Sequence, residues 1–134
     1  MFGLFKDKNK KKEVPKVSEE ILTEEQKEQL KKKIEDLNQE LKLTAENNPE
    51  QLAFICEKLG LAYAKLNQEN EAISVLEKSL SYKLTIGEGY KKLMSLYNAK
   101  RAEAAKKGDD SGIDYYMNKM DDMRQIAKKV TISR

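Results

Sequence analysis

Few residues in this sequence are of the types that carry out chemistry. The chain has 134 residues with no histidine and a single cysteine, Cys56, so the commonest general base and metal ligand is missing. Cys56 is close in sequence to apolar Phe54, Ile55 and Leu59, and no activating base is evident beside it. We therefore predict that its thiol is a small buried apolar group and not a nucleophile.

Two stretches that could hold an ion lack the spacing that ion binding requires. Asp109, Asp110 and Asp114 have neither the ligand spacing nor the terminal glutamate of an EF-hand, and we expect them at helix ends. Gly87 and Gly89 flank one glutamate, and no Lys-Ser/Thr pair follows as in a phosphate-binding loop. We expect no enzyme activity, no metal and no cofactor.

The first 20 residues, MFGLFKDKNKKKEVPKVSEE, form a basic segment. We predict a disordered tail, because such a run cannot bury enough apolar surface to order itself. The alternative is weak contact with an anionic membrane surface. Nucleic acid is a less favoured partner, since no aromatic residue lies among the lysines. The candidate membrane-contact residues are Phe2, Leu4, Phe5, Lys6, Lys8, Lys10, Lys11 and Lys12.

The composition predicts one all-α domain. Charged residues make up 37% of the chain, Gly and Pro are scarce, and 26 basic residues against 23 acidic ones leave a net charge of +3. No apolar run approaches the ~20 residues of a membrane span, and the first residues do not resemble a signal peptide. We expect a cytoplasmic protein, or one peripheral at the inner membrane face, and the Lys-, Glu- and Asn-rich composition is typical of a bacterial chain.

The helix nearest the tail should span residues 23–46. Thr23 and Gln26 match a capping box, and apolar residues then repeat at intervals of four and three, as in a coiled-coil seam. This helix either covers one end of the domain or forms a dimer. The seam residues are Leu30, Ile34, Leu37 and Leu41.

Four more helices are expected. Asn48 and Pro49 begin the second, which continues to about residue 66, and the third spans 69–82. The fourth continues to residue 107, and Ser111 is expected to cap the fifth. We expect the methionines at 94, 117, 120 and 123 in the core, although unbranched side chains also suit a ligand groove. The expected buried side of the fifth helix is Ile113, Met117, Met120, Ile126 and Val130.

Residues 49–84 resemble a tetratricopeptide repeat, a unit of about 34 residues built from two antiparallel helices. The residues that carry the resemblance are Leu59-Gly60, Tyr63, Ala72 and Leu76. Cys56 and Ser79 depart from the family pattern. The resemblance implies antiparallel hairpins in a right-handed superhelix, with a capping helix at 23–46, repeat one at 49–84 and a divergent repeat two at 87–130.

Repeat two is identified by Tyr90, Leu93, Met94 and Tyr97, and its helices are longer. The longer helices would make Ile113 and Met117 the counterparts of Ala72 and Leu76. Two repeats are fewer than the three usually needed for a stable array. The helix at 23–46, or a second copy of the chain in a homodimer, would supply the missing burial.

The resemblance implies that a ligand binds the concave face formed by the first helix of each pair. The lysines of this face suit a protein or peptide, including an acidic one. We therefore expect a protein-interaction module, such as a scaffold or adaptor, and the alternatives are a peripheral membrane adaptor and a structural homodimer. The groove residues carried over by position are Phe54, Glu57, Lys58, Leu61, Lys65, Lys91, Lys92, Ser95 and Asn98.

Overall fold

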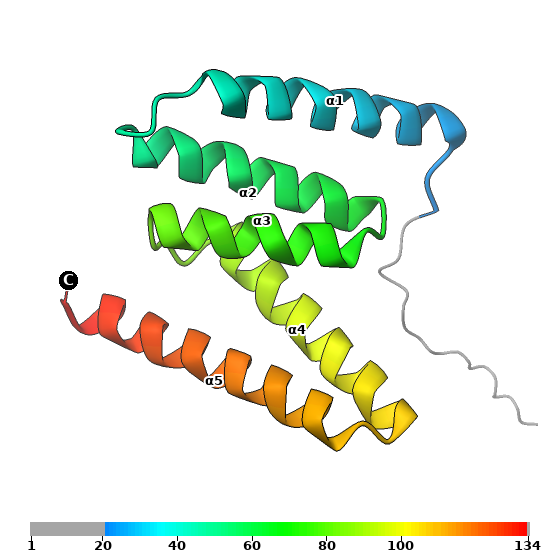
Figure 1. Cartoon of the computed structure of the whole chain (residues 1–134), viewed down its shortest axis with the longest axis vertical. Helices are drawn as coiled ribbons and strands as arrows, with labels where there is room; N and C mark the ends of the chain where they lie inside the picture. Colours follow the sequence, from blue (N-terminus) through cyan, green and yellow to red (C-terminus); the bar gives the residue numbers. More distant parts are fainter. Residues whose placement is uncertain (1–20, 134) are drawn as a thin grey trace, which may run out of the picture.

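The computed structural model describes residues 21–133, and the predicted N-terminal tail lies outside them. These residues form five α-helices and no strand (Figure 1), which confirms the expected all-α fold. Among them no helix is both long and apolar enough to cross a membrane. The helices are α1 (Glu24–Leu43), α2 (Pro49–Lys65), α3 (Glu69–Tyr82), α4 (Glu88–Lys107) and α5 (Asp110–Ser133).

Local side chains determine where the first two helices begin. The Thr23 hydroxyl accepts from the Gln26 amide at 3.1 Å and the Gln26 side chain accepts from the Thr23 amide at 3.0 Å, which confirms the capping box. The Asn48 side chain accepts from the Gln51 amide at 3.3 Å. α1 ends at Leu43, three residues before the expected end, because Thr44 adopts an extended conformation.

Tight connections join the hairpins. Asn67 has a φ of 61°, a left-handed conformation that asparagine tolerates better than most residues, and it lets α2 turn into α3. Gly108 ends α4 with a φ of 71°. The predicted Ser111 cap is wrong: the Asp109 carboxylate accepts from the Gly112 amide at 3.0 Å, so α5 begins earlier, at Asp110.

α2 and α3 lie side by side and antiparallel (Figure 1). A Cβ on Gly60 would lie 2.4 Å from Cγ of the fully buried Leu76, so the approach of the two helices requires glycine here. The Ser79 hydroxyl is buried and donates to the Ala53 carbonyl at 2.7 Å. That bond satisfies a polar group that would otherwise be buried without a partner.

α1 packs on α2 through the predicted seam. Ile34 and Leu37 are buried against Ile55, Leu59 and Ala62, while Leu30 and Leu41 pack at the edges of the same cluster. The seam of α1 is therefore covered by α2 of the same chain. In this position α1 caps the α2–α3 hairpin.

The second core cluster joins α3 to α4 and α5. Met120 and Met123 pack with Ala72, Leu76 and the buried residues of α4. The expectation for Met117 is wrong, because its side chain is 47% exposed. Tyr116 packs against the core in its place, because adjacent residues lie about 100° apart around a helix and the rotation of α5 turns Tyr116 inward and Met117 outward.

Candidate protein-binding groove

Three helices surround a basic groove with a volume of about 410 Å³. α2 forms one wall, α1 a second, and the start of α4 a third. Apolar atoms and lysine side chains both line this space, a mixture that suits a peptide with charged and apolar side chains. The lining residues are Leu30, Lys33, Lys58, Leu61, Ala62, Lys65, Glu88 and Lys92.

Helical periodicity aligns the residues of each wall. Lys58, Leu61 and Lys65 follow one another at intervals of three and four along α2, so they share one face of that helix. Leu30 and Lys33 are three residues apart on α1 and face them across the groove. The pattern places apolar side chains between lysines.

The charge of the groove is strongly positive. Four lysines line it against one carboxylate, that of Glu88. Across residues 21–130, no carboxylate forms an ion pair with any of these lysines. The Lys58 ammonium lies 4.6 Å from the centre of the Phe54 ring, which is half-exposed. An anionic ligand would therefore meet lysines whose charges are not already neutralised by neighbouring side chains of the described chain.

Glu57 has a structural role that sequence reasoning missed. Its carboxylate accepts from the Gly89 amide at 2.7 Å, so α2 caps the start of α4. α4 has no side-chain cap of its own, since Gly87 occupies its N-cap position. A Cβ on Gly89 would lie 2.9 Å from Cγ of Glu57. The contact orients the first turns of α4, which carry Lys92, toward the groove.

The structure brings together only part of the predicted site. Lys58, Leu61, Lys65 and Lys92 line the basic groove. Phe54 and Glu57 instead line a smaller hollow of about 230 Å³ beside Lys83 and Thr85. The others, Lys91, Ser95 and Asn98, are exposed on α4 and line neither space.

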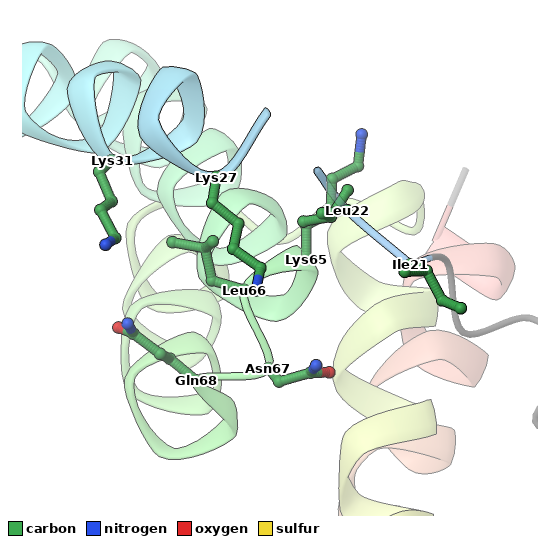
Figure 2. Close-up of a pocket in the computed structure, with 8 residues that line it drawn as sticks. All are labelled: Ile21, Leu22, Lys27, Lys31, Lys65, Leu66, Asn67 and Gln68. Atoms are coloured by element: carbon green, nitrogen blue, oxygen red, sulfur yellow. The ribbon is translucent and has the colours of Figure 1, made fainter. Parts of the chain in front are cut away.

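A second hollow of about 430 Å³, the end hollow, lies where α1 begins and α2 turns into α3 (Figure 2). Lys65 lines both the end hollow and the basic groove. Sequence reasoning missed this hollow, because its residues come from separate parts of the chain: the segment before α1, α1 itself, and the end of α2 with the turn after it. Its lining residues are Ile21, Leu22, Lys27, Lys31, Lys65, Leu66, Asn67 and Gln68.

Two titratable groups lie away from the groove. Cys56 is fully buried, as predicted, and burial raises the pKa of its thiol. Tyr97 is also buried and donates a hydrogen bond from its hydroxyl to Glu77. Burial first and this hydrogen bond second raise the pKa of Tyr97. Both groups therefore stay protonated at neutral pH.

Within the described part of the chain, no cluster of three or more His, Cys, Asp or Glu residues could hold a metal ion. The predicted membrane-contact residues, Phe2 to Lys12, lie outside that part. Comparisons with protein-family models, with curated proteins and with solved structures give no match to this chain.

Proposed function

We propose that this chain is a protein-interaction module, resembling a tetratricopeptide-repeat protein of two repeats, that binds a protein or peptide in the basic groove. The observation that carries the proposal is that four lysines and three apolar side chains, those of Leu30, Leu61 and Ala62, line one space between three helices. Such a mixed surface suits an extended chain better than a small substrate, because charge and apolar contact are both spread along it.

The packing of α2 against α3 supports the resemblance. Leu76 packs directly against Gly60, where the repeat pattern has a small residue. Ala72, the second small residue of the pattern, is fully buried. These are the contacts that the repeat pattern requires of its hairpin. Three of the five α2 residues at which the resemblance implies a ligand, Lys58, Leu61 and Lys65, line the basic groove, which supports the proposal.

Neighbouring lysines of α4 offer a matched test. Both Lys91 and Lys92 are exposed, but only Lys92 lines the basic groove. In a pull-down from native cell extract, we expect Lys92→Glu to lose a bound protein that the intact chain and Lys91→Glu both retain. The affinity of that protein should fall about tenfold or more for Lys92→Glu, because a charge-assisted contact becomes repulsive.

Circular dichroism should show that both variants keep the helix content of the intact chain. Equal recovery of the partner by all three proteins would contradict the groove assignment, and so would equal loss from both variants.

A further inference from the structure

The end hollow adjoins the basic groove at Lys65, whose side chain lines both. Its walls combine the same two chemical features. Leu22 and Leu66 are partly exposed apolar side chains, and Ile21 is 96% exposed at the rim. A segment that leaves the basic groove past Lys65 would therefore meet a second apolar surface.

Lysines surround this second surface as well. In Figure 2, Lys27 and Lys31 extend from α1 across the space toward Leu66 and the Asn67–Gln68 turn. Each is 3.6 Å from a glutamate of its own helix, but every partner in the two pairs is 45% exposed or more. Exposed pairs of this kind contribute little, so the two lysines can exchange these partners for a ligand carboxylate.

We infer that the end hollow is a second anchoring site for the same ligand, an extended acidic peptide that carries two apolar side chains. The inference rests on the proposed function of the basic groove. One apolar side chain of the ligand contacts Leu61 in the groove, and the other contacts Leu22 and Leu66 in the end hollow. Acidic residues around them meet the lysines of both spaces.

The helix geometry predicts the spacing of the two anchors. Leu61 and Leu66 are five positions apart on and just after α2, a rise of about 7.5 Å at 1.5 Å per residue. At about 3.6 residues per turn their side chains also point about 140° apart, which adds about 10 Å across a helix about 11 Å wide. The rise and the turn together separate the two anchors by about 13 Å, which four residues of an extended chain span. The ligand should therefore carry its apolar side chains at positions i and i+4, with acidic residues between them.

Charge favours an acidic peptide over a second copy of this chain as the occupant. A symmetric dimer through the end hollow would bring the same lysines of two copies together, because such an interface pairs each patch with itself. An acidic peptide brings carboxylates to these lysines instead.

The test uses the full-length chain and fluorescent peptides. One probe separates two leucines by three glutamates, as Glu-Leu-Glu-Glu-Glu-Leu-Glu, and two others replace one leucine or the other by alanine. By fluorescence anisotropy, the two-leucine probe should bind the intact chain about tenfold tighter than the better one-leucine probe. In the variant Ile21→Ala/Leu22→Ala, which alters exposed or partly exposed side chains, this ratio should fall to near one.

The controls separate this inference from the proposed function. Lys92→Glu should weaken all three probes while the two-leucine preference remains. The basic N-terminal segment is the same in every protein tested, so its attraction for acidic peptides cancels in the ratio. If the two-leucine preference survives Ile21→Ala/Leu22→Ala, the second anchor is refuted and the groove stands.

If no probe responds to Lys92→Glu, the groove itself is refuted. If light scattering shows a dimer that Ile21→Ala/Leu22→Ala dissociates, a second copy occupies the hollow and the inference is overturned.

Discussion

Tyr97 is the titratable side chain most strongly affected by the fold. Its ring packs in the core of α3, α4 and α5, 6.2 Å from the ring centre of Tyr116, and its hydroxyl bonds to Glu77. Glu77 also lies 3.6 Å from the ammonium group of Lys119, so α3, α4 and α5 meet in one polar contact at the edge of an apolar cluster. The phenolic proton is held more tightly in the folded chain than in the unfolded one.

The tighter hold on the Tyr97 proton in the folded chain predicts how the free energy of unfolding depends on pH. Since the folded pKa of Tyr97 lies above its unfolded value of about 10, the contribution is complete below about pH 10 and is lost as the pH rises above it. The loss should be about 1.4 kcal/mol per pH unit. In urea unfolding at pH 9 and pH 11, Tyr97→Phe should lose less stability between the two conditions than the intact chain. Every other residue is the same in the two proteins, so parallel losses would contradict the prediction.

At the scale of elements, the start of α4 depends on another helix. α1, α2 and α5 are capped by residues next to them in sequence. α4 has a glycine, Gly87, at its N-cap position, and its Gly89 amide is capped by Glu57, 32 residues away. A carboxylate at a helix N-terminus accepts a hydrogen bond from an amide that has no partner within the helix, and its charge interacts favourably with the helix dipole. The same contact aligns α4 with α2, and the groove wall depends on that alignment.

Replacing the Glu57 carboxylate should destabilise the start of α4. Glu57→Ala is expected to lower the free energy of unfolding by about 1–2 kcal/mol in urea denaturation followed by circular dichroism. A Cβ at Gly87 would meet nothing within 4 Å, so Gly87→Ser can supply a local cap. The serine should restore more stability to Glu57→Ala than it adds to the intact chain, where the Gly89 amide is already paired. Equal gains in both backgrounds would contradict the capping role.

At the scale of the whole molecule, two apolar clusters meet on the α2–α3 hairpin. Tyr63 packs against both clusters. α1 belongs to one of them and also supplies Leu30 and Lys33 to the basic groove. The helix that shields the hairpin therefore also builds the proposed ligand site.

Two leucines of α1 test this dual role. Leu37 is 8% exposed against α2, whereas Leu43 is 85% exposed on the last turn. Leu37→Ala should lower the free energy of unfolding by about 2–4 kcal/mol, and Leu43→Ala by no more than about 0.5 kcal/mol. Leu37→Ala should also weaken the acidic peptide probes, because a displaced α1 opens the groove. If peptide affinity is unchanged by Leu37→Ala, α1 is not part of the site.

Much of the fold is predicted by local patterns. The Thr23 capping box, the Asn48 start of α2 and the helical period of each segment involve residues three or four positions apart, so short-range geometry decides them. The Gly60–Leu76 contact also follows from the sequence, because a connection of three residues holds α2 and α3 close enough to pack on each other.

The site depended on longer-range placement. Lys91 and Lys92 are identical residues side by side in sequence, yet only Lys92 lines the groove, because the rotation of α4 about its axis decides which one faces α2. In the same way, the rotation of α5 about its axis turns Tyr116 toward the core and leaves Met117 exposed. Rotations of this kind are settled by the packing of whole helices, to which many distant side chains contribute.

The sequence by itself thus determined five helices, the caps at Thr23 and Asn48 and one hairpin, since these arise from interactions between near neighbours. Only the tertiary structure decided that Glu57 caps α4 and that lysines of three helices share one groove. It also decided that the end hollow adjoins that groove at Lys65. The physical reason is that each of these features joins segments far apart in the chain, whose relative positions are determined by the packing of the apolar core.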